Sequence, residues 1–385
     1  MIRASYDFEA TGQRAQTDLV LRADGLPEKR IFFEFVGPAA PRHRPGAEFA
    51  ILAALPMAMR LGQPIHASGT ADASFLASIE ELQEVWHRWR PDLFRPVPLS
   101  VDAEAKPARR EGRRAIAAFS GGLDSIFALH AHRRKLLGRR SLDVEGAFLV
   151  QGFDLPLDAG ERFDRARRSA AAILDHYEVP LTTVRTDWGR LSSPWGQTFM
   201  IGLAAIFHQF SDAFDQGVVA ADMPYEGEIL GWGNNSITNP MLGSLHFPIR
   251  STGGGWSRSE KAGLLGMEPA VLANLRICTN SPTGENCGIC EKCIRTKLNF
   301  LVNGIDDVPA LGGPVTAEAL GKVRITNGAQ ANLWREILEH GSWDRIPEIR
   351  GQIEAMIRAG VRPDAQPARR RPRVRLRLWW KYRRA

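Results

Sequence analysis

Cysteine is scarce in this chain. Four occur in 385 residues, and all of them lie between Cys278 and Cys293. A disulfide framework usually spreads its cysteines along the fold and is rare in a reducing compartment, so the cluster indicates a metal site. Long apolar runs are also absent: none approaches the ~20 residues that span a bilayer, and Met1–Asp7 has no apolar signal-peptide core. We expect a cytoplasmic protein without a membrane span.

Excess basic charge is absent from most of the chain. The net charge is +7, but residues 362–385 hold ten Lys or Arg residues and one Asp, which is +9 and leaves −2 for residues 1–361. The charge therefore does not indicate a nucleic-acid-binding body. A hydrophobic fraction of 44% and a charged fraction of 24% are typical of a globular protein, and the length allows two domains.

The basic tail has a pattern of its own. Over residues 371–380, Arg recurs at every second position, opposite apolar residues such as Leu376 and Trp380. A period of two predicts a strand with one basic and one apolar face. We expect this strand to dock on a partner protein or on a second copy of the chain. Contact with nucleic acid or an anionic membrane, or a solvated tail, are the alternatives.

One stretch carries the strongest motif. The apolar run Ala115–Phe119 ends in Ser120 and two glycines, and an amphipathic run follows Ser125, which predicts a strand, a tight turn and a helix. The glycines let the backbone approach an anion, and the N–H groups of the helix start face it. The two serine hydroxyls add donors, and Asp124 could help to hold a phosphate-bound metal. We interpret the stretch as a pyrophosphate-binding loop; an ordinary glycine turn is the alternative.

Two other nucleotide motifs do not fit this loop. No Lys follows the glycines, as the Walker loop requires, and the three spaced glycines of the dinucleotide fingerprint are missing.

Strands and helices are expected to alternate beyond the loop. This order predicts an α/β fold with a doubly wound parallel sheet. Ligands of such sheets bind at the carboxyl ends of the strands, near a switch in strand order, so residues 120–125, Asp154, Asp187 and Asp222 should surround one crevice. The expected strands are 115–119, 142–153, 180–186 and 217–221, and the expected helices are 161–177 and 198–210.

Four parts are expected along the chain. Residues 1–110 form an additional α+β domain of unknown role, residues 111–312 the nucleotide-binding domain, residues 313–361 C-terminal helices, and residues 362–385 the basic tail. Within and between these parts we expect strands at 17–21, 29–36 and 96–101, helices at 49–61, 75–89, 332–340 and 346–359, a linker at 102–114 and a covering loop at 224–255.

A short helix is expected to open at Ser257–Lys261. Its basic residues, Arg258 among them, either reach the far side of a phosphate chain or lie in solvent.

The cysteines follow the pattern C-x8-C-x2-C-x2-C. Four thiolates close a tetrahedral zinc site with no open position, which is structural, and Gly288 eases the tight turn of the second half. An iron–sulfur cluster is the alternative, because four cysteines hold it equally well. The proposed ligands are Cys278, Cys287, Cys290 and Cys293.

Together, the glycine loop and the cysteine pattern resemble the 7-cyano-7-deazaguanine synthase family of the ATP pyrophosphatase (PP-loop) superfamily. The segment Gly196–Ile206 is similar to the central helix of that family, Asn286–Cys293 matches its C-G-x-C-x-x-C stretch, and Arg295 lies one position before the place of its following Arg. The resemblance covers residues 115–305 and favours zinc over an iron–sulfur cluster.

The resemblance implies specific chemistry. Enzymes of the family use ATP and Mg²⁺ to adenylate the carboxylate of 7-carboxy-7-deazaguanine; ammonia displaces AMP, and a second activation gives the nitrile. Carried over by position, the four cysteines would bind Zn²⁺, and Asp124 and Ser125 would lie at the reacting groups. The residues expected to contact the nucleotide are Ser120, Gly121, Gly122, Leu123, Asp124, Ser125, Gly196, Gln197 and Arg258.

The chain departs from the family pattern in its acceptor half. Gln197-Thr198 stands where the family has Arg-Asn, Arg258 replaces a Lys while Glu260 is kept, and residues 224–245 lack the family's S-G-Y-P-D-C stretch. We therefore expect an ATP-dependent ligase that activates a small-molecule carboxylate, a deazapurine or a related one, and transfers it to ammonia or to another amine, including that of a protein or peptide. The alternatives are RNA thiolation or another tRNA modification, and a subunit that binds a nucleotide without turning it over.

Overall fold

The computed structural model describes residues 1–359 except 108, 192, 279, 280, 327, 341 and 345. The tail predicted at 362–385 lies outside the described residues. The strands are β1 Ile2–Thr11, β2 Arg14–Ala23, β3 Lys29–Val36, β4 Ile65–Asp72, β5 Leu99–Ala105, β6 Arg114–Ala118, β7 Asp143–Gln151, β8 Leu181–Thr186, β9 Gln216–Ala220 and β10 Ile249–Thr252.

The helices follow the expected positions closely; α6 is the short helix expected to open at 257–261, and α7, α8 and α9 are additions. They are α1 Glu48–Leu61, α2 Ala73–Trp89, α3 Leu123–Arg133, α4 Gly160–His176, α5 Trp195–Phe207, α6 Arg258–Leu265, α7 Pro269–Asn274, α8 Glu291–Leu301, α9 Ala317–Lys322, α10 Gly328–Glu339 and α11 Pro347–Arg358. None of the described helices is long and apolar enough to cross a bilayer.

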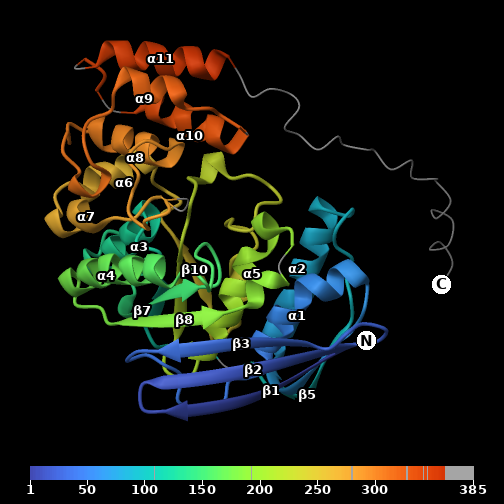
Figure 1. Ribbon diagram of the computed structural model, residues 1–385. Coiled ribbons are helices and arrows are strands. Elements are labelled where there is room, and N and C mark those ends of the chain that lie inside the picture. The colour runs from blue at the N-terminus through green and yellow to red at the C-terminus, as the bar shows by residue number, and fades with distance from the viewer. Residues whose placement is uncertain are drawn as a thin grey trace, which may run out of the picture.

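All ten strands form one sheet, in the order β10-β9-β6-β7-β8-β3-β2-β1-β4-β5. Six of the nine pairings are parallel, and only β1–β2, β2–β3 and β3–β8 are antiparallel. The predicted α/β class with a largely parallel sheet is confirmed at this level (Figure 1).

The strand order switches at β6. This strand lies between β7 and β9, so the chain runs outward to both sides of it, and the carboxyl end of β6 is the point where such sheets bind ligands. The short residues of β6 allow helices on both faces. Ile116 packs with α5 and α1, whereas Ala115 and Ala117 pack with α3 and α4.

The first 110 residues continue this sheet. Strand β3 pairs with β8 from Phe33↔Thr186 to Val36↔Thr183, and α1 lies beside α5 (Figure 1). Buried polar contacts cross the same seam, because Trp188 Nε1 donates to the carbonyl of Ala53 at 3.0 Å. The domain boundary expected near residue 110 therefore runs through a continuous sheet and a shared core.

Three strands, β1, β4 and β10, were not predicted from the sequence. β1 alternates buried Ile2, Ala4 and Tyr6 with outward polar residues, but small Ala weakens that signal. β4 contains Gly69 and gains its place from its neighbours β1 and β5. β10 lies inside the segment 224–255 that was expected to be loop throughout, so that expectation is wrong for residues 249–252. The linker expected at 102–114 is also shorter, since β5 extends to Ala105.

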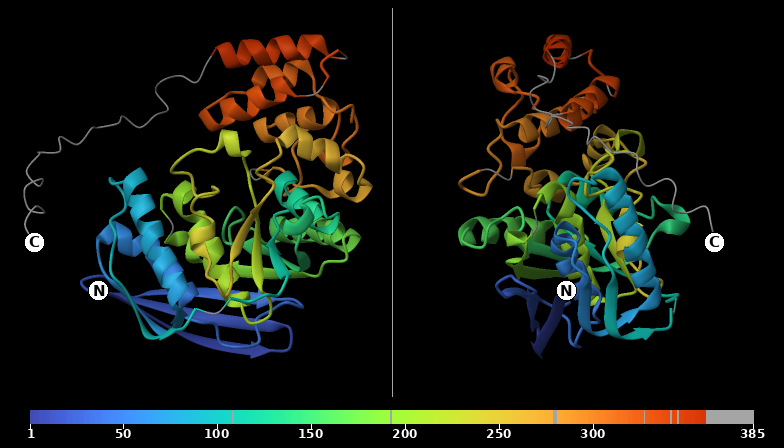
Figure 2. Two further views of the ribbon diagram at one scale, coloured as in Figure 1. Left: turned by 180° about the vertical axis from the view of Figure 1, so that it is seen from behind. Right: turned by 90° about the vertical axis from the view of Figure 1, so that its right-hand side faces the viewer.

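The C-terminal helices form a separate layer on the carboxyl-end side of the sheet (Figure 2). Helices α8, α10 and α11 enclose a small core that includes Leu298, Trp334 and Ile353. The two helices predicted at 332–340 and 346–359 are confirmed as α10 and α11.

Candidate nucleotide site and cysteine cluster

The loop between β6 and α3 has the geometry of an anion-binding turn. Gly121 has a φ of +73°, a conformation that favours glycine, and Gly122 begins the helix without a side-chain cap. Within the described part of the chain, no acceptor takes the backbone N–H groups of Leu123, Asp124 or Ser125. These donors and the positive end of α3 therefore remain available to an anion.

The two serines brace the turn. Ser125 Oγ donates to the carbonyl of Gly122 at 3.0 Å and lies 3.2 Å from Ser120 Oγ, which accepts from the Gly122 N–H at 3.3 Å. The Leu123 side chain is buried, so only its backbone can face a ligand.

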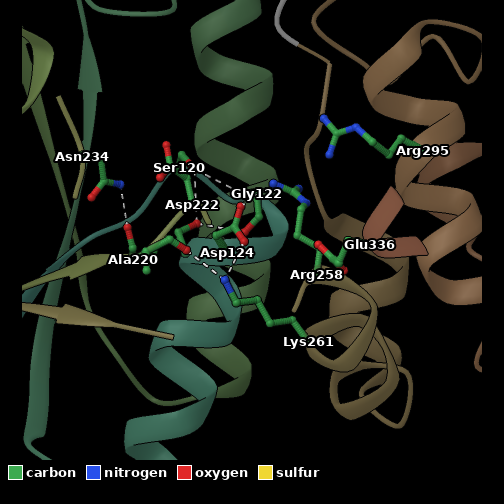
Figure 3. A network of polar contacts seen from close by, with 12 residues as sticks. Ser120, Gly122, Asp124, Ala220, Asp222, Asn234, Arg258, Lys261, Arg295 and Glu336 are labelled. Atoms are coloured by element: carbon green, nitrogen blue, oxygen red, sulfur yellow. Dashed lines mark hydrogen bonds and ion pairs between the residues drawn. The ribbon is translucent and has the colours of Figure 1, made fainter. Parts of the chain in front are cut away.

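Asp124 is held between two cations of α6 (Figure 3). Arg258 Nη1 donates to Oδ2 at 2.7 Å, and Lys261 Nζ donates to Oδ1 at 3.0 Å and to the carbonyl of Ala221 at 2.9 Å. Burial opposes ionisation of Asp124, but the charges of Arg258 and then Lys261 outweigh it, so its pKa is lowered. The helix start at 257–261 is therefore not a solvated one. Its cations face the glycine loop.

Asp222 lies next to this pair with the opposite behaviour. It follows β9 at the carboxyl end of the sheet, and its Oδ2 accepts from Trp232 Nε1 at 3.0 Å. Burial, reinforced by the negative charge of Asp124, raises the pKa of Asp222 to about 6. Two neighbouring carboxyl groups with pKa values shifted apart are typical of acid–base sites.

Arg276 approaches the loop from the other side. Its backbone N–H donates to the carbonyl of Gly121 at 2.7 Å, and its Nη1 lies 3.5 Å from the carbonyl of Ser120. Burial lowers its pKa, and among the described residues its Nε and Nη2 find no hydrogen-bond acceptor. Buried donors of this kind are normally satisfied, so their position beside the loop points to an anion.

A fourth cation, Arg295, lies above and to the right of Arg258 in Figure 3. Its Nε donates to Glu291 Oε1 at 2.7 Å, and Trp334 Nε1 donates to the same oxygen at 3.0 Å. Burial and then the charge of Arg258 lower the pKa of Arg295. Arg295 Nη1 and Arg258 Nε also lack acceptors within the described chain. The site therefore holds four cations and an incomplete set of acceptors.

The four cysteines form a compact group. Their Sγ atoms all lie within 4.8 Å of one another, and Cys278 Sγ is 3.7 Å from Cys287 Sγ and 3.9 Å from Cys290 Sγ. A tetrahedral ion with Zn–S bonds near 2.3 Å separates its sulfurs by about 3.8 Å. The group can hold a metal ion, and its spacing is compatible with zinc.

The cysteine segment is tied to the glycine loop. Asn286 Oδ1 accepts from the N–H groups of Ile277 and Cys278 at 2.7 and 3.0 Å, and its amide donates to the carbonyls of Leu275 and Ala310 at 2.8 Å. Arg276 lies within this braced stretch, so the cysteine segment fixes its position. Gly288 has a φ of +73°, and a Cβ there would lie 2.8 Å from the Leu311 carbonyl, which supports the turn predicted at this glycine.

Among the described residues, Gly196 and Gln197 are hydrogen-bonded to Gly233 and Gly231 and not to the glycine loop. The carbonyl of Gly196 accepts from the Gly233 N–H at 2.8 Å, and Gln197 Nε2 donates to the Gly231 carbonyl at 3.3 Å. A Cβ on Gly196 would come within 2.7 Å of the Trp232 ring. These two residues therefore position the segment that carries Trp232 to Asp222.

The two other residues expected at the crevice, Asp154 and Asp187, have different surroundings. Burial lowers the pKa of Arg276, and the negative charge of Asp154 partly opposes that shift. Asp187 instead accepts from the Phe32 N–H at 3.1 Å and pairs with Arg190 at 3.6 Å, which places it at the seam between β8 and β3. Lys261 is one of the two basic residues of the helix start expected at 257–261, whereas sequence patterns missed Arg276, whose only signal was its place two residues before Cys278.

No protein-family model, curated protein or solved structure matches the chain. Function is therefore inferred from the residues and their geometry.

Proposed function

We propose that the protein is an ATP-dependent ligase that adenylates a small-molecule carboxylate, releases pyrophosphate and passes the acyl group to an amine. The observation that carries this proposal is the uncapped glycine loop surrounded by Arg258, Lys261 and Arg276, with buried guanidinium donors that find no acceptor among residues 1–359 as far as these are described. A polyphosphate chain supplies the missing acceptors. Cations and oriented N–H groups of this kind stabilise the charge that develops on a leaving pyrophosphate.

The reaction needs two displacements. A carboxylate oxygen attacks the α-phosphorus, and the bond to the bridging oxygen breaks as pyrophosphate leaves. The amine nitrogen then attacks the acyl carbon, AMP leaves, and the nitrogen loses one proton. Asp222, with a pKa raised to about 6, is mainly ionised at neutral pH and is the group we assign to accept that proton.

In the chain without nucleotide, Asp124 occupies Arg258 and Lys261. We propose that phosphate oxygens take over these cations and that the carboxylate of Asp124 becomes available to Mg²⁺. Mg²⁺ usually binds one or two carboxylates together with substrate phosphates, so the donor set fits this ion. When bound, the ion would neutralise phosphate charge.

A row of aromatic rings next to Asp222 supports a planar heterocyclic carboxylate, such as a deazapurine. Phe153, Trp195, Phe199 and Trp232 follow one another with ring-centroid distances of 5.1, 6.0 and 5.8 Å, and Trp232 is 36% exposed. Exposed aromatic faces stack on flat rings.

We further propose that the cysteine group holds a structural Zn²⁺. Cys287 is exposed, but a closed four-thiolate site leaves none of the four cysteines free for a thiolation reaction, which disfavours the RNA-modification alternative.

The test is incubation of the full chain with ATP, Mg²⁺ and 7-carboxy-7-deazaguanine, with and without ammonia, followed by nucleotide chromatography and mass spectrometry. We expect AMP and pyrophosphate, and loss of both with Arg258→Gln but not with the exposed control Arg190→Gln. Formation of ADP, or no turnover with any deazapurine carboxylate, would contradict the proposal.

A further inference from the structure

A second cavity lies between α3 and the edge strand β10. It has a volume of about 640 Å³ and is lined mainly by residues 109–113, 139, 140, 142, 248 and 250–256 and by His132 of α3. His132 Nε2 lies 2.9 Å from Thr252 Oγ1 and joins the helix to the strand. No residue of the glycine loop lines this cavity, so it is separate from the nucleotide site.

Arginine dominates the lining. The cavity contains six arginines and one acid, Glu111; the arginines are Arg109, Arg110, Arg113, Arg139, Arg140 and Arg250. Of these six arginines, only Arg110 lies within 4 Å of a carboxylate of the described residues, that of Asp215 at 3.8 Å. Residues 1–361 carry a net charge of only −2, so this concentration of positive charge is local and the overall composition conceals it.

Several of these guanidinium groups are free for a ligand. Arg113 donates to the Ser141 carbonyl, and Arg250 Nε donates to Gln216 Oε1 at 3.1 Å. Arg139 and Arg140 are exposed, and their side chains make no hydrogen bond or ion pair within the described chain. The basic tail cannot neutralise the cavity, because it carries the same sign of charge.

One end of the cavity adds aromatic surface. Tyr225, which is 53% exposed, and Trp256 lie there beside three glycines, Gly253–Gly255. The Tyr225 ring lies against the backbone of Gly254, where a Cβ would come within 2.7 Å of it. A basic groove with an aromatic end is the arrangement that binds phosphates and stacks bases of single strands.

We propose that this cavity binds single-stranded nucleic acid, with Arg139, Arg140 and Arg250 on the phosphates and Tyr225 stacked on a base. Arginine rather than lysine fits this role, because its planar fork matches phosphate oxygens. An acidic peptide would satisfy the charges but would make no use of the aromatic end.

The test measures the fluorescence anisotropy of a labelled 20-nucleotide RNA, and of DNA of the same sequence, with the full chain over a range of salt concentrations. The double variant R139E/R140E is compared with R167E/R168E, which changes two adjacent exposed arginines on α4 and gives the same net charge. We expect R139E/R140E to weaken binding at least about tenfold more than the control, and to reduce the slope of log affinity against log salt by about 1.4. Thermal melting verifies the fold, and Arg250→Gln provides a second probe of the same cavity.

Equal losses in the two double variants would overturn the proposal, because binding would then follow net charge or the tail. If neither the RNA nor the DNA binds at low salt, the proposal is overturned as well.

A second arm tests the aromatic end and the ligand class. Tyr225→Ala should weaken oligonucleotide binding about tenfold, while Tyr225→Phe and binding of inorganic polyphosphate stay unchanged. Tight binding of poly-glutamate that R139E/R140E abolishes, without binding of either strand, would assign the cavity to an acidic protein partner and overturn the proposal.

Discussion

The clearest energetic prediction concerns Lys261. Its side chain is inaccessible to solvent, and it donates to Asp124 at 3.0 Å and to the Ala221 carbonyl at 2.9 Å. Lys261→Met removes the charge with little change in volume, and leaves a buried carboxylate and a buried carbonyl with one donor fewer. Breaking a buried ion pair costs about 3–5 kcal/mol. Because Arg258 still pairs with Asp124, we expect the low end, about 3 kcal/mol less free energy of unfolding in urea.

The chain offers a matched control for this measurement. Lys135 pairs with Asp143 at 2.9 Å, nearly the same distance, but both side chains are about half exposed. Lys135→Met should therefore cost at most about 1 kcal/mol.

A double-mutant cycle gives the decisive result. Asp124→Asn removes the charge that Lys261→Met leaves unpaired. The double variant should therefore lose about 1–3 kcal/mol less free energy of unfolding than the two single variants lose in sum. If Lys261→Met costs no more than Lys135→Met, or if the two changes at Lys261 and Asp124 add without coupling, the buried pair does not exist as described.

Three further predictions follow from the site. The pKa of Asp222 is about 6 in the folded state and about 4 in the unfolded state, so the folded state binds more protons. The free energy of unfolding of the wild type in urea, taken relative to that of Asp222→Asn, should therefore fall by up to about 3 kcal/mol from pH 4 to pH 7. A difference that stays constant or rises with pH contradicts this. Arg276→Ala should weaken ATP binding about 10- to 100-fold by calorimetry, with Arg190→Ala unchanged. A zinc chelator should lower both the melting temperature and ATP affinity, since the cysteine segment positions Arg276; loss of bound metal with no change in either would separate the cysteines from the site.

Much of the fold was predictable because its signals are local. The strand, glycine turn and helix at 115–133 need only their own residues, and Asp72 caps the start of α2, where it accepts from the Ser74 and Phe75 N–H groups at 2.7 and 3.2 Å. The seam between β3 and β8 was not predictable, because it joins residues about 150 positions apart and no motif specifies an antiparallel pairing.

The site was predictable only in part for the same reason. The spacing of the residues in Ser120–Ser125 and of the cysteines makes both motifs recognisable in the sequence. Lys261, in contrast, reaches the site only because α6 packs against α3. Arg139 and Arg250 are 111 positions apart in the sequence, and nothing short of the folded chain reveals that they line one cavity.

The shared sheet has a consequence for how this protein can be divided. In a sheet that ended at β8, that strand would expose its unpaired N–H and C=O groups, and α5 would lose the cover of α1. Open edges of this kind recruit other chains. The first 110 residues therefore cover an edge of the sheet and a face of α5 that the rest of the chain would leave open, so a truncation at residue 110 should yield aggregates.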